Sequence, residues 1–125
     1  MNNPSNLSYS KTHEWIETTE SGGFRVGLTD YAQSSLGDIV FVNLPEMGES
    51  LYSGESFGDV ESVKAVSDLY SPFTGTVAAV NSLLLDSPEL INQEPYEAWL
   101  IEVDGVTDYE ELLDADEYAS FCEAQ

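Results

Sequence analysis

Positive charge is what this sequence lacks most. Its 125 residues include three Lys and Arg residues against 24 Asp and Glu, for a formal net charge of -21 at pH 7. Such a chain repels phosphate backbones and anionic lipid, so we expect it to bind neither nucleic acid nor a membrane surface. The acidity has two compatible explanations, which are adaptation to a salty cytosol and docking against partners that have basic surfaces.

Cysteine and histidine are also nearly absent. The single Cys122 cannot form an internal disulfide, and together with the single His13 it cannot build a structural zinc site, so we expect no metal. One histidine leaves only one possible base for a catalytic triad. A structural role is typical of a lone histidine in a strand, although the neighbouring Glu14 leaves proton transfer open for His13. We therefore expect no catalytic residues in this chain.

Long apolar runs are missing as well. No stretch approaches the length of a transmembrane helix. The first ten residues have neither the apolar core of a secretory signal nor the arginine-rich amphipathic character of a transit peptide. We expect a cytoplasmic protein, and a mature organellar form stays open.

What the sequence does contain is a series of short strands separated by glycine and proline. A length of 125 residues with 42% hydrophobic content suits one domain with one core, over residues 1–125. The crossover helices of a parallel sheet are missing, so the pattern favours a mainly β sandwich or flattened barrel with short helices. The expected strands span residues 13–18, 24–28, 39–42, 76–81 and 99–103.

Helix signals are few. Thr29 is a good N-cap for a short helix that runs through Leu36 and ends at Gly37. A serine followed by proline at 87–88 predicts one helical turn through residue 92. Residues 73–75 have the composition of a turn.

The two ends of the chain differ in character. Residues 1–8 are polar and are expected to be loose. Thr107 and Glu110 have the spacing of a capping box, so a C-terminal helix is predicted over residues 107–123. Its apolar stripe would consist of Leu112, Ala115, Ala119 and Cys122.

Residues 58–75 form a near-mirror about Lys64-Ala65. The mirrored pairs are Val63 with Val66, Ser62 with Ser67, Glu61 with Asp68, and Val60 with Leu69. This symmetry predicts a β-hairpin with a two-residue loop. The loop has no residue suited to positive φ, so a type I turn is expected rather than I′ or II′. Lys64 would then stand at the tip with its side chain in solvent, where another protein can modify it, whereas Lys11 has no comparable setting.

The hairpin sequence ESVKAVSD followed by SPFTGTV resembles the lipoylation hairpin of the glycine cleavage system H protein family. Further similarity extends over residues 9–122. It includes HEW at 13–15, GLTDYAQ at 27–33, LGDIVFV at 36–42, LPEMG at 44–48, NQEPY at 92–96 and EYASFC at 117–122. The chain departs from the family at Ala98, where glycine is usual, and at Lys11, where proline is common.

The resemblance implies a lipoyl carrier of the biotinyl/lipoyl-carrier fold with no reaction of its own. Lipoic acid would be attached to Lys64 in amide linkage by a lipoate ligase or lipoyl transferase. The carrier would pass the aminomethyl group of glycine among a glycine decarboxylase, an aminomethyltransferase and a dihydrolipoamide dehydrogenase. We expect it to be a monomer.

Further site residues follow from the same resemblance. Glu14 and Asp68, with Thr12 beside them, are expected to hold the aminomethyl-lipoyl arm, because a carboxylate near an ammonium forms a charge-assisted hydrogen bond. Glu61 and Gly75 match positions that the family uses for recognition by the lipoylating enzyme. Glu61 also has the simpler interpretation of a cross-strand partner within the hairpin.

Other functions compete with this one. The chain is compatible with a lipoyl donor for other lipoate-dependent complexes, with a biotin carrier domain, or with the lipoyl domain of a 2-oxoacid dehydrogenase. A biotin carrier normally has its lysine between methionines, whereas the neighbours here are Val63 and Ala65. A plain interaction module without a prosthetic group is the remaining alternative.

Overall fold

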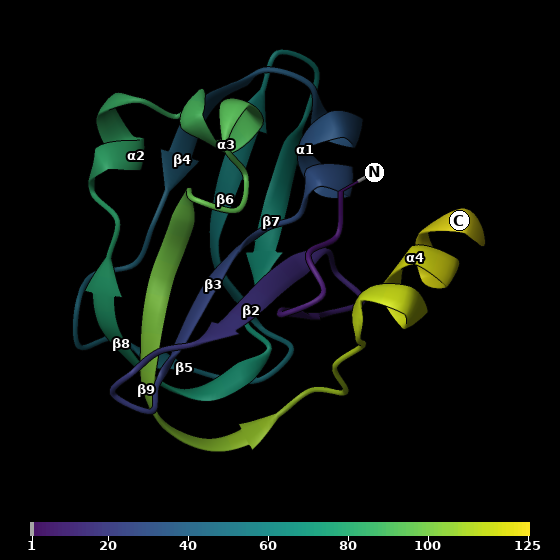
Figure 1. Ribbon diagram of the computed structural model, residues 1–125. Coiled ribbons are helices and arrows are strands. Elements are labelled where there is room, and N and C mark those ends of the chain that lie inside the picture. Colours follow the sequence, from purple (N-terminus) through teal and green to yellow (C-terminus); the bar gives the residue numbers. More distant parts are fainter. Residues whose placement is uncertain (1) are drawn as a thin grey trace.

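The computed structural model describes residues 2–125, which form two antiparallel sheets that do not close into a barrel (Figure 1). The larger sheet has the strand order β1-β2-β3-β9-β8-β5, and the smaller has the order β4-β6-β7. The strands are β1 (Ser8–Tyr9), β2 (Glu14–Thr18), β3 (Phe24–Leu28), β4 (Ile39–Asn43), β5 (Ser50–Leu51), β6 (Ser56–Ser62), β7 (Val66–Tyr70), β8 (Phe73–Val80) and β9 (Trp99–Tyr109). The mainly β fold predicted from the sequence is confirmed.

The core lies between the two sheets. Val26 and Ile101 of the larger sheet and Val60 and Leu69 of the smaller are fully buried in one apolar cluster. Along β7 the side chains alternate, so Leu69 faces the core while Val66 and Asp68 are exposed. This period of two residues is what a strand with one buried face requires.

Four short helices complete the described chain: α1 (Asp30–Leu36), α2 (Leu83–Asp86), α3 (Leu90–Gln93) and α4 (Ala115–Glu123). The prediction for α1 is confirmed, since the Thr29 hydroxyl accepts a hydrogen bond from Ala32 N at 3.2 Å and Gly37 ends the helix with φ 81°. The sequence reasoning missed α2. None of the helices in residues 2–125 has the length and apolar character needed to span a bilayer.

The predicted start of the C-terminal helix is wrong. Residues 107–109 continue β9, and Asp108 and Tyr109 pair with Thr74 and Phe73 of β8, where residues 73–75 were expected to form a turn. The capping box lies further on, where Asp114 and Glu117 exchange hydrogen bonds of 2.9 and 2.8 Å at the start of α4. The predicted apolar stripe is confirmed in part: Ala115 and Cys122 pack in the cluster of the fully buried Tyr118, whereas Leu112 precedes the helix and packs against the main core.

The expectation that residues 1–8 are loose is wrong for residues 2–8, and Met1 lies outside the described residues. Leu7 is buried, and Asn2 N donates to Asp30 Oδ2 at 3.0 Å. The Tyr96 hydroxyl donates to Asn2 O at 2.5 Å. These contacts attach the N-terminal segment to the body of the protein in spite of its polar composition.

The hairpin of β6 and β7 has a register different from the mirror. Glu61 pairs with Val66, so the two residues at the tip are Val63 and Lys64 rather than Lys64 and Ala65. Ser62 N donates to Ala65 O at 2.8 Å, and the Ser62 hydroxyl accepts from Lys64 N and Ala65 N at 3.2 and 3.1 Å. No tip residue has positive φ, so the expectation against I′ and II′ turns is confirmed.

Gly75 lies in β8 where the strand approaches β9 closely. A Cβ at this position would stand 2.7 Å from the Asp104 carbonyl oxygen and 3.0 Å from Val103 Cγ1. We expect Gly75→Ala to lower the free energy of unfolding by about 1–3 kcal/mol, because the strands must separate to admit the methyl group. Urea denaturation measures this loss, and the exposed neighbour Thr76 provides the control Thr76→Ala. Equal stabilities of the two variants would contradict the prediction.

Candidate functional site

Lys64 is exposed at the tip of the β6–β7 hairpin, at the top of Figure 1. Among the described residues it takes part in no ion pair. The other two cations, in contrast, are in ion pairs. Lys11 Nζ lies 2.8 Å from Glu111 Oε1, and Arg25 Nε lies 3.0 Å from Glu102 Oε2. The Lys64 amine is therefore both accessible and uncommitted, as an acyl attachment point must be.

The turn that presents Lys64 is fixed from two sides. Ser62 is buried, and its hydroxyl accepts the hydrogen bonds of the turn. Val63 N donates to Asp38 O at 3.0 Å, which ties the tip to the segment between α1 and β4. A Cβ on Gly37 would be 3.5 Å from Lys64 Cε, so the lysine stem runs beside Gly37. These contacts fix the conformation of the turn and therefore the direction in which the Lys64 side chain leaves it.

Glu14, the first residue of β2, is a buried carboxylate with 1% of its surface exposed. The Ser10 hydroxyl donates to its Oε1 at 2.6 Å, and the Thr12 hydroxyl donates to the same oxygen. Tyr70 N donates to Oε2 at 3.3 Å. Burial raises the pKa of Glu14 to about 7 although these donors favour the charged form. The group can therefore exist in either protonation state near neutral pH.

Tyr70 of β7 connects Glu14 to Asp68. Its backbone N–H donates to Glu14, and its hydroxyl donates to Asp68 Oδ2 at 3.5 Å. Asp68 itself is exposed, two residues nearer the hairpin tip. The structure thus brings Thr12 and Glu14 into direct contact and joins Asp68 to them through Tyr70. Sequence reasoning missed Ser10 and Tyr70, whose roles depend on contacts between strands that carry no local signal.

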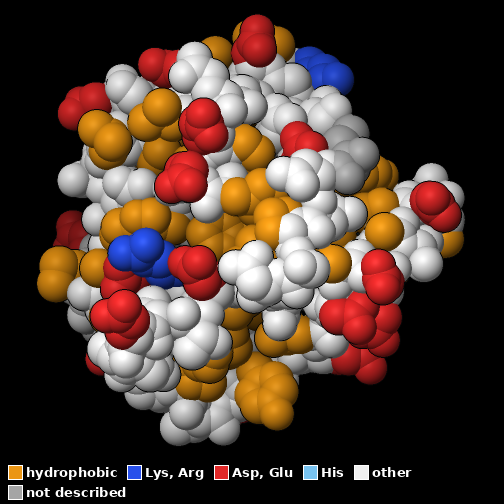
Figure 2. All heavy atoms as spheres, viewed as in Figure 1, with side chains coloured by type: hydrophobic (Ala, Val, Ile, Leu, Met, Phe, Trp, Pro, Cys, Tyr) orange, Lys and Arg blue, Asp and Glu red, His pale blue; other side chains and the backbone are white. Residues whose placement is uncertain are grey.

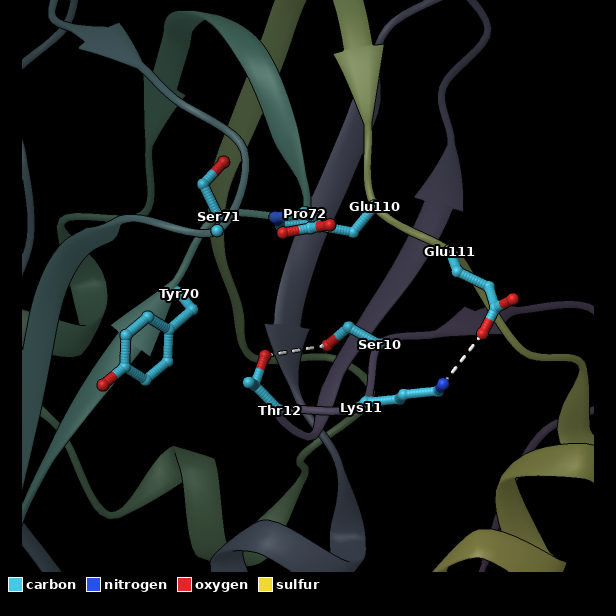
Figure 3. Close-up of a pocket in the computed structure, with 9 residues that line it drawn as sticks. Ser10, Lys11, Thr12, Tyr70, Ser71, Pro72, Glu110 and Glu111 are labelled. Atoms are coloured by element: carbon cyan, nitrogen blue, oxygen red, sulfur yellow. Dashed lines mark hydrogen bonds and ion pairs between the residues drawn. The ribbon is translucent and has the colours of Figure 1, made fainter.

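A pocket of about 390 Å³ opens beside these groups (Figure 3). In Figure 3, Ser10 and Thr12 lie on one side, and Tyr70, Ser71 and Pro72 lie across from them. Its remaining lining residues are Lys11, Gly54, Glu110 and Glu111. The pocket combines apolar walls with carboxylates and with the hydroxyl groups that bind Glu14. Such a recess suits a small group that carries positive charge.

The other predicted residues lie elsewhere. Glu61 is exposed on β6 between its partners Phe41 and Val66, which agrees with a cross-strand role in the hairpin. Gly75 pairs with Leu51 in the larger sheet, so the structure does not bring it together with Glu61.

His13 faces away from the Glu14 carboxylate. Its Nδ1 lies 2.8 Å from the Tyr118 hydroxyl, and its ring packs beside Tyr31. Burial lowers the pKa of His13. The structural role expected for this residue fits these contacts. Within residues 2–125, no group of three or more His, Cys, Asp or Glu side chains is placed to bind a metal ion.

The raised pKa of Glu14 makes a prediction about stability. Between pH 4.5 and about 7 the folded chain retains a proton that the unfolded chain has lost, so stability falls as pH rises through this window. Glu14→Gln removes this pH-dependent loss of stability, because the glutamine side chain does not titrate. We expect its stability relative to the native chain to improve by about 3 kcal/mol from pH 4.5 to pH 8. Urea denaturation at a series of pH values measures the difference, with the exposed Glu20→Gln as control. A difference between the Glu14→Gln variant and the native chain that is independent of pH would contradict the prediction.

Comparison with known proteins identifies the family. The model of the family "Glycine cleavage H-protein" matches residues 7–125. A glycine cleavage system H protein of Lachnoclostridium phytofermentans is 55% identical over 93% of this chain and 91% of its own, and one of Geobacillus thermodenitrificans is 50% identical over 96% of each. The crystal structure of such a protein from Mycobacterium marinum superposes with a TM-score of 0.88 at 47% identity, covering 94% of this chain and 96% of that one.

These matches extend over nearly the whole chain and do not favour a biotin carrier or a lipoyl donor for other complexes. They agree with a β-rich fold that presents an exposed lysine on a fixed hairpin turn. The chain belongs to the glycine cleavage H-protein family and is a lipoyl carrier of the glycine cleavage system.

Proposed function

We propose that Lys64 carries lipoic acid in amide linkage. The observation that supports this most directly is that Lys64 is exposed on a fixed turn and, among the described residues, has no ion-pair partner. Acylation removes the charge of the amine, and at this position it breaks no ion pair among residues 2–125. When bound, the lipoyl group would supply two sulfur atoms, one of which carries the aminomethyl group, and the pair passes between dithiol and disulfide. The chain supplies a platform and takes no catalytic part.

We further propose that Glu14, Thr12 and Asp68 hold the ammonium end of the cargo. Asp68 is four residues from Lys64 and two from Tyr70, which lines the pocket, so Asp68 lies between the hairpin tip and the pocket. A cation near Glu14 favours the ionised carboxylate, which would lower its pKa from about 7 and give a charge-assisted hydrogen bond. The recess also limits the access of water to a group that decomposes in water.

The partners we propose are a glycine decarboxylase, an aminomethyltransferase and a dihydrolipoamide dehydrogenase, together with a lipoate ligase or lipoyl transferase that recognises Glu61 and Gly75. The net charge of -21 favours partners with basic docking surfaces. Figure 2 shows carboxylates at many points of one face and little positive charge. We propose that the chain acts in the cytoplasm as a monomer with one domain, bound in turn by each enzyme.

Attachment to Lys64 predicts a change in intact mass. After expression with lipoate and its ligase, we expect the native chain to gain one lipoyl group and Lys64→Arg to gain none, because arginine cannot form this amide. Lys11→Arg is the matched control and should be lipoylated like the native chain. Mass spectrometry of the intact proteins measures both. A lipoyl increment that persists in Lys64→Arg would refute the attachment site.

The holding site predicts the lifetime of the cargo. We expect Glu14→Gln to speed the loss of the aminomethyl group from the loaded carrier by roughly tenfold to a hundredfold, the range of one charge-assisted hydrogen bond. Release of ammonia from the isolated loaded carrier measures this rate. Asp68→Asn should have a smaller effect because Asp68 is exposed. Glu20→Gln is the control, and a Glu14→Gln rate equal to that of this control would exclude the holding role.

A further inference from the structure

The segment Ser10–His13 connects β1 to β2 and contains both hydroxyl groups that donate to Glu14. His13 ends this loop with φ 73°, and it is the only non-glycine residue with positive φ among those described. The left-handed region is unfavourable for a residue with a Cβ, so contacts outside the loop must hold His13 in it.

Tyr118 of α4 provides these contacts. Its hydroxyl lies 2.8 Å from His13 Nδ1 and 2.7 Å from the Thr29 hydroxyl, and Thr29 N donates to His13 O at 3.1 Å. Tyr118 is fully buried. The ring of Tyr9, which precedes the loop, stacks on the Tyr118 ring with centroids 4.6 Å apart and planes 9° apart. One side chain of α4 therefore contacts both Tyr9, which precedes the loop, and His13, which ends it.

The chain that leads into α4 adds two further links to the same loop. Tyr9 and Leu113 exchange backbone hydrogen bonds of 2.8 and 2.7 Å. Lys11, in the middle of the loop, lies 2.8 Å from Glu111. Figure 1 shows α4 outside the two sheets, at the side where the N-terminal strands begin. Residues 111–121 thus contact the loop before, within and after its turn.

We propose that Tyr118 is a positioning residue for the Glu14 site. By holding His13 in the left-handed conformation, the Tyr118 hydroxyl directs the Ser10 and Thr12 hydroxyls at the Glu14 carboxylate. The C-terminal helix thereby determines the geometry of the group that holds the cargo. This inference rests on the holding role proposed for Glu14.

The first test uses the bare chain. Tyr118→Phe keeps the ring that stacks on Tyr9 and removes only the hydroxyl. Tyr70 N lies 3.3 Å from Glu14 Oε2, so its amide ¹⁵N shift reports the ionisation of Glu14 in an NMR titration. Glu14→Gln confirms the assignment by abolishing that inflection. We expect Tyr118→Phe to move the midpoint of this Tyr70 titration by about half a pH unit or more. The reason is that the loop supplies both hydroxyl donors to the Glu14 carboxylate and part of its burial. An unchanged midpoint overturns the inference.

The second test uses the loaded carrier. We expect Tyr118→Phe to speed the loss of the aminomethyl group by about fivefold, the factor that one hydrogen bond is worth. The double variant with Glu14→Gln should lose it no faster than Glu14→Gln alone, because both changes act through one carboxylate. If the rate increases of the two single variants multiply in the double variant, the inference is overturned. The exposed Tyr52 provides the control Tyr52→Phe.

The two tests separate this inference from the proposed function. If Glu14→Gln leaves the rate of loss unchanged, the holding role fails, and the Tyr70 titration still decides whether Tyr118 positions the loop. If Tyr118→Phe does not fold, His13→Ala replaces it, because alanine loses the ring that contacts Tyr118 but keeps the Cβ that makes φ 73° unfavourable. A shifted midpoint of the Tyr70 titration in His13→Ala supports the inference, and an unshifted one overturns it.

Discussion

The buried carboxylate of Glu14 imposes the constraint on which the site depends. A charged or polar group taken out of water must find hydrogen-bond donors, and Glu14 finds them in two different sheets. The hydroxyls of Ser10 and Thr12 come from the loop that leads into β2 of the larger sheet, and the N–H of Tyr70 comes from β7 of the smaller sheet. Apolar packing brings the two sheets together but tolerates small changes in their relative position. The hydrogen bond between Tyr70 N and Glu14 does not, because donor and acceptor must lie within hydrogen-bond distance.

The proposed attachment point and the proposed holding site lie apart in the structure. Lys64 stands on a rigid tip that any enzyme can approach, whereas Glu14 lies inside, with the exposed Asp68 between them along β7. A swinging group can therefore rest against the protein or extend from it without a change in the fold. A raised pKa also suits the proposed holding role, because a Glu14 without a cation beside it can take up a proton instead.

Local signals in the sequence predicted local structure well. The cap at Thr29, the alternation along the strands and the exposed hairpin lysine were all recognisable, since each depends on neighbours in the chain. The start of the C-terminal helix was not, because pairing of β9 with β8 overrides the capping pattern at Thr107. Tyr118 and Tyr70 act through partners about a hundred and about fifty residues away, and only the folded arrangement reveals such pairs. Periodicity alone would not single out Glu14 and Thr12, which are proposed as site residues on the family resemblance.

The hairpin register has a consequence for the position of Lys64, the proposed site of modification. The mirror pairing and the observed pairing differ by two residues, and a shift of two leaves every side chain on the same face of the sheet. Core packing therefore cannot distinguish between them. The buried hydroxyl of Ser62 does, since it accepts the N–H groups of the two residues that follow Val63. Ser62 thus fixes the register of the hairpin, and with it the placement at the tip of Lys64, the proposed attachment point two positions further along the chain.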